Sequence, residues 1–369
     1  MNPKLRPVDA QWIEHEGHPA LLLQDRSAIG SRVVLVPQAL APLLALCDGT
    51  RDVAALGADL EQMAAIRLSA SAIEQAISQL DRALLLDNER FSHACRQALK
   101  AYRSAPHRPA FLAGLSYPAD PQELREILEG HIAGVDGHAE PDPLRAGSLR
   151  GLICPHIDYD RGGPVYATIW GKVREALDEA DLFIILGTDH TGRPGEIALT
   201  RQSYQTPFGL LPTDLEVVNG VAKAMGEEAA FRSELNHLGE HSVEMAAVWL
   251  HHAVGDRPIR VVPVLCGSFH PFIEGKGSPE DYPAWKAGAE ALGEAAGRDG
   301  VMVIAAADLS HIGPAFGDPS PLRDAEKDDL AEFDSDILAA VVSGDAQAFL
   351  RRLVQETDRH RVCGLPPIY

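Results

Sequence analysis

The sequence predicts an α/β fold, a mostly parallel sheet with helices on both faces, preceded by a small winged-helix-like α+β domain. From residue 150 onward, short apolar runs typical of buried strands alternate with amphipathic helical stretches. This alternation indicates parallel strands joined by helices. Over residues 1–100, two strand-like segments are followed by helical segments and a short apolar run, which is typical of a separate small domain.

The first domain is expected to span residues 1–91. Strands are predicted at 19–25 and 32–36, a helix at 39–47, and a short strand or wing at 84–87. Asp48 and Gly49 break the helical pattern, so Thr50 is predicted to cap a second helix. A third helix is indicated by apolar residues at helical spacing, namely Ile73, Ile77, Leu80 and Leu84.

Residues 92–108 are expected to form a linking helix and loop, followed by the α/β domain at 109–369. Its first helix has Asp120 at the cap, Pro121 at the first helical position and Glu123 at the capping-box position. A polar loop rich in glycine and proline is predicted at 134–147. Buried strands are expected at 149–154, 180–187, 259–267 and 301–307, with helices at 165–180, 214–226, 244–254 and 284–297.

Composition narrows the function classes. The net charge of −20 and the pI near 5.1 argue against a surface for nucleic acid or anionic membranes, because such surfaces need clustered Lys and Arg. No apolar run approaches the roughly 20 residues that span a bilayer, and the first residues lack a signal-peptide core. The five cysteines are scattered without a C-x-x-C pair, which argues against a disulfide framework or structural zinc cluster. We therefore expect a cytoplasmic protein.

Polar residues of the metal-ligand type follow three of the predicted strands directly. They are His156 and Asp158 after the first, Asp189 and His190 after the second, and Asp308 and His311 after the fourth. Because the carboxyl ends of parallel strands line the ligand crevice of an open α/β sheet, these side chains are predicted to gather at one edge. One such histidine is more often structural, but three at equivalent positions favour a metal or acid/base site.

A further cluster lies within residues 237–245 and contains His237, Glu240, His241 and Glu244. His241 and Glu244 are three residues apart, so they are predicted to share one face of the helix that follows. The alternative is an ordinary polar helix start, with Ser242 or a neighbour as its cap. The sequence has none of the glycine motifs for nucleotide binding and no G-x-S-x-G elbow.

Residues 1–91 resemble the PqqD-like family, whose members bind peptides for radical-SAM maturation systems. The resemblance is carried by LRP at 5–7, LCDGTRDVAAL at 46–56 and LDRALLLD at 80–87. It implies a peptide or a radical-SAM protein as the partner of this domain. The alternative is a winged helix used only for packing or dimerisation.

Residues 109–369 resemble the Memo-like family, also called AmmeMemoRadiSam system protein B. The motifs stand in family order: AGLSYPADPQELREILEGHI, PHIDYDRGGPVYA, ILGTDH, TPFGLLPTD, GEHSVEM, VPVLCGSF, ADLSHIGPAFGD and RVCGLPPIY. The family's fold is similar to that of LigB-type class III extradiol dioxygenases, which are non-haem iron(II) enzymes. The family normally continues with a helix after the last motif, so a C-terminal truncation after Tyr369 stays open.

The resemblance implies metal ligands at His156, His190 and Cys363, with Fe²⁺ as the first choice and Cu or Zn as alternatives. Two imidazoles and a thiolate leave coordination positions open, as a reactive metal requires. Around the metal it implies catalytic residues, with His311 as the acid/base: His311, Asp308, His241 and Glu240. We further expect the carboxylates of Asp158 and Asp189 to orient the ligands or shape the pocket entrance.

Three functions remain open at this point. The first is redox chemistry of the dioxygenase type with iron(II), on a small substrate that the sequence does not identify. The second is a non-catalytic accessory protein that binds a peptide or protein partner through the first domain. The third is a metal-free fold in which the histidines are structural.

Overall fold

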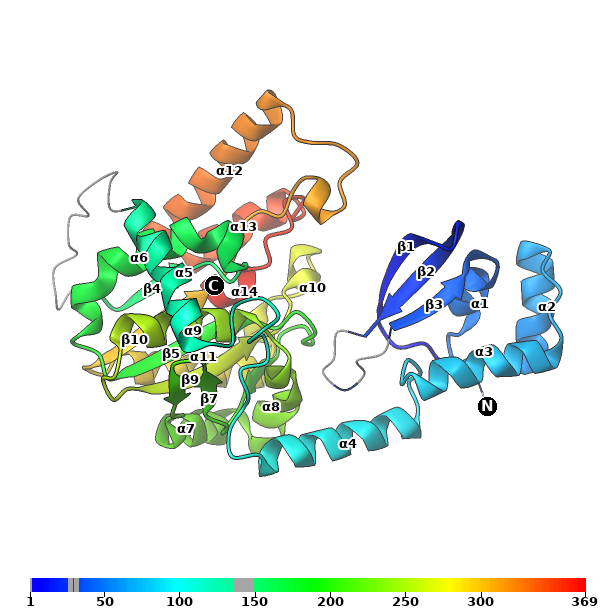
Figure 1. The fold of residues 1–369 in the computed structure, drawn as a ribbon, viewed down its shortest axis with the longest axis horizontal. Helices are drawn as coiled ribbons and strands as arrows, with labels where there is room; N and C mark the ends of the chain where they lie inside the picture. Colours follow the sequence, from blue (N-terminus) through cyan, green and yellow to red (C-terminus); the bar gives the residue numbers. More distant parts are fainter. Residues whose placement is uncertain (1, 26–28, 30–32, 136–148) are drawn as a thin grey trace. The chain divides into compact units, whose positions relative to one another are not determined.

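The computed structural model describes residues 2–25, 29, 33–135 and 149–369. Most of the polar loop expected at 134–147 lies outside the described residues. The chain divides into two compact units, an N-terminal unit, Met1–Ser104, and a C-terminal unit, Ala105–Tyr369 (Figure 1). A small domain therefore precedes a larger α/β domain.

The N-terminal unit combines a three-stranded antiparallel sheet with helices. The strands β1 (Asp9–His15), β2 (His18–Gln24) and β3 (Val33–Pro37) lie in that order, and the short helix η1 (Gln38–Leu40) and the helices α1 (Ala41–Leu46), α2 (Val53–Ala64), α3 (Ala70–Arg82) and α4 (Glu89–Ser104) follow. The strand β1 was not predicted because six of its seven residues are exposed, so the sequence carries no buried-strand pattern there. In place of the predicted strand at 84–87, the structure has an isolated bridge between Leu5 and Leu86.

Capping side chains fix the starts of the helices in this unit. Asp52, and not Thr50, caps α2 by accepting a hydrogen bond from the Ala55 amide. The Thr50 hydroxyl instead donates to Asp48 at 2.6 Å, so the DGTRD stretch is a turn before the helix. Ser69 caps α3 in the same way as Asp52 caps α2.

The C-terminal unit is built on a five-stranded sheet, and its mostly parallel arrangement is confirmed. The strands β4 (Gly151–Cys154), β5 (Leu182–Thr188), β6 (Ile197–Leu199), β9 (Arg260–Cys266) and β10 (Val301–Ala306) lie in the order β4-β10-β5-β9-β6. Only the last pairing, of β6 with β9, is antiparallel within this sheet. The short strands β7 (Tyr204–Thr206) and β8 (Gly209–Leu211) form a separate hairpin that the sequence did not predict.

Helices cover both faces of this sheet, and alternate residues of β5 mark the two faces. Phe183 and Ile185 pack in a core cluster with the helices α6 (Tyr159–Leu177) and α9 (Ser242–Val254), and with α5 (Pro121–Val135), which packs against α6. Leu182 and Ile184 belong to a second cluster with α7 (Leu215–Met225), α8 (Glu227–Phe231) and α11 (Pro283–Ala296). The Asp120 cap of α5 is confirmed by hydrogen bonds from the amides of Gln122 and Glu123.

A third apolar cluster joins the C-terminal helices to the unit. These helices are α10 (His270–Ile273), α12 (Asp324–Val342), α13 (Ala346–Gln355) and α14 (Leu365–Ile368). Elsewhere in the C-terminal unit, three short helices connect longer elements, namely η2 (Glu234–Leu238), η3 (Pro279–Asp281) and η4 (Pro314–Phe316). Phe269, Phe333 and Phe349 are at most 2% exposed in this cluster. It anchors the segment that carries Cys363, because Val362 and Leu365 on either side of the cysteine belong to it.

The close packing of α6 against α5 requires a glycine at position 163 of α6. A Cβ atom added at Gly163 would lie 2.3 Å from ring atoms of His131 on α5. We expect Gly163→Ala to lower the free energy of unfolding by about 1–3 kcal/mol through overpacking. Urea denaturation measures this. The matched control is Gly171→Ala on the same helix, where a Cβ meets nothing within 4 Å and a gain of about 0.5–1 kcal/mol is expected.

Candidate metal centre

The predicted gathering of side chains at the carboxyl edge of the sheet is present. His156 follows β4, His190 follows β5, and Asp308 follows β10. His241 joins them from the start of α9, and Cys363 from the segment before α14. Three imidazoles meet here. The ring centroid of His156 lies 5.2 Å from that of His190 and 5.2 Å from that of His241. The rings of His190 and His241 stack on each other, with 4.6 Å between their centroids.

Within the described ranges, two groups of side chains at this edge could hold a metal ion. One consists of His156, His190 and His241, and the other of His156, Asp308 and Cys363, with the donor atoms of each group within 4.8 Å of one another. His156 belongs to both groups. His190 and Cys363, which the family resemblance placed in one ligand set, fall into different groups.

His156 is the most buried of these side chains, and hydrogen bonds to the backbone and to Asp308 hold it in place. Its Nδ1 lies 2.9 Å from the Ala306 carbonyl oxygen, and its backbone amide donates to Asp308 Oδ1 at 2.9 Å. Because a carbonyl only accepts, Nδ1 carries the proton and Nε2 offers its lone pair, 3.2 Å from Cys363 Sγ. Burial lowers the pKa of His156 to about 4, so the ring is neutral at pH 7.

Glu240 lies directly behind the other two imidazoles. Its carboxylate is 3.0 Å from Nδ1 of His190 and 3.0 Å from Nδ1 of His241. It also accepts hydrogen bonds from the backbone amides of His190, His241 and Ser242. Burial alone would raise the pKa of Glu240, but hydrogen bonds from the two histidines outweigh it and hold this pKa well below its usual value. Glu240, and not Ser242, therefore satisfies the first amides of α9.

Cys363 and His311 meet on the other side of His156. Cys363 Sγ lies 3.7 Å from His311 Nε2, and the carbonyl oxygen of Cys363 accepts a hydrogen bond from the Thr188 hydroxyl. Burial raises the pKa of Cys363 to about 12, so in the absence of a cation the side chain is a thiol. Nδ1 of His311 lies 2.8 Å from the Leu309 carbonyl oxygen, which leaves its Nε2 as the unprotonated nitrogen.

A cavity of about 360 Å³ opens onto these side chains. Its polar lining is His156, His190, His241, Asp308 and His311, with Ser116, Asp158 and Arg161. Its apolar lining includes Leu112, Ile157, Met245 and Phe316. Leu112 gave no signal in the sequence, and Ser116 stood there only as part of the AGLSYPADPQELREILEGHI motif; both come from the irregular segment before α5. The cavity has room for a small organic molecule beside the imidazoles.

Of Asp158 and Asp189, which were expected to orient the ligands or shape the pocket entrance, Asp158 lines the cavity and Asp189 is not among its lining residues. The carboxylate of Asp158 caps α6 by accepting from the Arg161 amide, and it accepts a second bond from Arg161 Nε at 2.7 Å. It lines the cavity but does not hold His156. Asp189 accepts from Thr191 and Asn236, and burial raises its pKa to about 6. The orientation of the histidine rings belongs instead to Glu240 and to the Ala306 carbonyl.

His241 and Glu244, which were predicted to share one face of the helix, have different surroundings in the structure. His241 precedes the first turn of α9, whereas Glu244 lies within it and is fully buried against Arg108 and Tyr117. Glu244 also accepts from two backbone amides, those of Phe111 and Leu112. His237 is structural too, since burial lowers its pKa to about 3 and its ring bonds to Tyr204 and Ala198.

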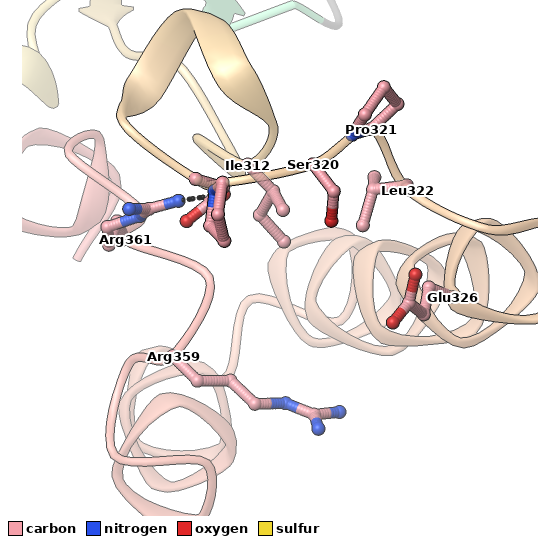
Figure 2. Close-up of a pocket in the computed structure, with 9 residues that line it drawn as sticks. Ile312, Ser320, Pro321, Leu322, Glu326, Arg359 and Arg361 are labelled. Atoms are coloured by element: carbon pink, nitrogen blue, oxygen red, sulfur yellow. Dashed lines mark hydrogen bonds and ion pairs between the residues drawn. The ribbon is translucent and has the colours of Figure 1, made fainter.

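A second cavity, of about 320 Å³, lies beside the segment that carries His311 (Figure 2). Among its lining residues are Arg359, Arg361 and Asp318. Arg361 has a φ of 53°, uncommon for a residue with a side chain, and its guanidinium donates to the carbonyls of His311 and Phe316 and to Asp318. These bonds tie the Cys363 segment to the His311 segment.

The fold and this cluster define an α/β protein with a candidate metal centre at the carboxyl edge of a parallel sheet. The family model for Memo-like proteins matches residues 108–369, and the chain belongs to that family. It is 26% identical to a MEMO1 family protein of Aquifex aeolicus over 329 residues, which cover 89% of this chain and 80% of the relative. It is 31% identical to a MEMO1 family protein of Thermococcus onnurineus over 264 residues, which cover 69% of this chain and 82% of that relative. None of the helices in the described ranges is long and apolar enough to cross a membrane.

Proposed function

We propose that the chain binds one divalent transition metal ion at His156, with Fe²⁺ as the first choice, and supports redox chemistry on a small substrate. The observation that carries the proposal is the set of acceptors behind the imidazoles. His156 has the Ala306 carbonyl at Nδ1, and His190 and His241 have Glu240. Metal-ligating histidines need such a partner, because it fixes the ring and leaves Nε2 for the ion.

The geometry favours a single ion. His156 is common to both donor groups, and its Nδ1 is occupied by Ala306, so only Nε2 can coordinate. An ion there can take further ligands from the imidazole side, His190 and His241, or from Cys363 and Asp308. A mixed set of nitrogen, sulfur and oxygen donors suits Fe²⁺, with zinc and copper as alternatives. Cys363 would coordinate as a thiolate, since a bound cation deprotonates the thiol.

In this proposal the chain's own groups bind the substrate and move its proton. Iron(II) bound at His156 would supply one-electron and O₂ chemistry. Apolar walls from Leu112, Met245 and Phe316 hold the body of a substrate in the cavity. His311 Nε2, the unprotonated nitrogen of a ring that lines the cavity, is placed to accept a proton from it.

Metal analysis after anaerobic purification tests the binding step. We expect about one iron per wild-type chain, and reduced content in His241→Ala and Cys363→Ser. Protein with no stoichiometric transition metal, before or after anaerobic loading, would overturn the proposal.

The reaction step has its own prediction. His311→Ala is expected to keep its iron while losing O₂ consumption with candidate phenols by a factor of about 10²–10⁴, the usual contribution of a positioned acid/base. O₂-electrode assays measure it. Turnover that is unchanged in this variant would remove His311 from the mechanism.

We also propose a second role, in which the N-terminal unit binds a peptide or a radical-SAM protein. Its support is exposed apolar side chains on the small sheet: Trp12 on β1 is 54% exposed on one face, and Val33 on β3 is 52% exposed on the other. Pull-down of a radical-SAM protein by the full chain, weakened in Trp12→Ser but not in Trp285→Phe, would support this role. Equal capture by both variants would count against it.

A further inference from the structure

We infer that Glu240 is a positioning residue that holds two of the metal ligands, His190 and His241, as one unit, while His156 is held independently. The inference rests on the proposed metal binding and deepens it. Glu240 was expected to be catalytic from the family resemblance. Its position behind the imidazoles, outside the residues that line the cavity, supports a different role.

The contacts of Glu240 reach both ligands through side chain and backbone. Oε1 lies 3.0 Å from Nδ1 of His190 and 3.0 Å from Nδ1 of His241. Oε2 accepts from the His190 amide at 2.9 Å, and Oε1 accepts from the His241 amide at 2.8 Å. The carboxylate side chain is only 5% exposed, so water competes little for these bonds. Both residues are therefore fixed at the ring and at the main chain by one group.

This arrangement sets the proton positions on both rings. A carboxylate only accepts hydrogen bonds, so each ring carries its proton on Nδ1 and offers the lone pair of Nε2. The two rings are nearly parallel, with planes 20° apart and centroids 4.6 Å apart. Fixed in this way, the two Nε2 atoms are available on adjacent, similarly oriented rings. His156 is oriented by the Ala306 carbonyl instead, so its orientation does not depend on Glu240.

Glu240 also supplies charge that the imidazoles lack. Three neutral histidines would bring no negative charge to a divalent cation. A buried carboxylate one hydrogen bond behind two of them offsets that charge and increases the basicity of both ligands. A single substitution at position 240 should thus weaken two metal–ligand bonds at once.

The test compares Co²⁺ binding by wild type and Glu240→Gln, using chelator competition and the visible spectrum of the bound ion. The amide keeps the size of the side chain but points an NH₂ group at N–H donors, so at least one ring loses its acceptor. We expect Co²⁺ affinity to fall about 10–100-fold and the spectrum to change. The matched control is Glu196→Gln, which makes the same change at a carboxylate that pairs with Arg232 and belongs to neither donor group; its Co²⁺ affinity should stay at the wild-type value.

A second comparison separates positioning from a purely structural role. In a His190→Ala/His241→Ala background, adding Glu240→Gln should cause no further loss of Co²⁺ affinity, because the groups it acts through are gone. A structural role would lower the melting temperature of the metal-free protein and leave Co²⁺ affinity and spectrum unchanged in Glu240→Gln. That result, in a wild type that binds Co²⁺, would overturn this inference alone. Wild-type protein that binds no Co²⁺ would overturn the proposed function as well.

Discussion

Replacing His156 by alanine is expected to reduce bound iron to less than a tenth of the wild-type content, the largest loss from any single change at the site. His156 is the one side chain that belongs to both donor groups, so its removal leaves neither group with three donors. Loss of any other ligand leaves one group of three intact. The His156→Ala variant should still fold, because the His156 ring belongs to none of the three apolar clusters that hold the C-terminal unit together.

Iron content after anaerobic loading, measured by elemental analysis, checks the prediction. His270→Ala is the matched control, since the side chain of His270 is 73% exposed and belongs to neither donor group. It should keep the wild-type iron content. A His156→Ala protein that retained as much iron as His190→Ala would show that His156 does not have this central position.

Replacing Arg108 by methionine is expected to lower the free energy of unfolding of the C-terminal unit by about 3–5 kcal/mol. Arg108 and Glu244 form an ion pair in which both side chains are 0% exposed. Removing the guanidinium leaves the Glu244 carboxylate buried without its counter-charge. It also removes the bonds that Arg108 donates to the carbonyls of His237 and Glu240, just before α9.

Urea unfolding followed by tryptophan fluorescence measures this effect, because Trp170, Trp249 and Trp285 lie in the C-terminal unit. The double variant Arg108→Met/Glu244→Leu should lose less stability than the sum of the two single variants, since no lone charge is left buried. Lys327→Met, which breaks the exposed pair with Asp324, should change stability by no more than about 0.5 kcal/mol. A loss in Arg108→Met no larger than in this control would contradict the argument.

The sequence predicts most of the central sheet because its inner strands are buried on both faces. Continuous apolar runs such as LFIIL in β5 occur where neither side of a strand meets water. The strand β1 escapes prediction because it is exposed, and β6 to β8 escape because three residues are too few to show a period. The helices α12 and α13 lie beyond the last predicted strand, outside the stretches whose apolar periodicity predicted helices.

At the site, the sequence identifies the metal-donor side chains better than the groups that accept hydrogen bonds from them. His156, His190 and Asp308 follow directly from strand ends, and their meeting point follows from parallel topology. The assignment of Asp158 and Asp189 relied on adjacency in sequence, but neighbouring side chains near a strand end point in different directions. The Ala306 carbonyl carries no side-chain signal at all. Glu240 lies 50 residues beyond His190, and only the packing of α9 against β5 brings the two together.

The strand order has a consequence for how the centre is made in the cell. The strand β4 lies at one end of the sheet beside β10, although about 150 residues separate their sequences. A ribosome synthesises β4 long before its neighbour exists, and His156 gains its Ala306 contact only once β10 has emerged. Metal loading should therefore be a late event in biogenesis, and chains released before residue 306 should be unable to capture the ion at His156.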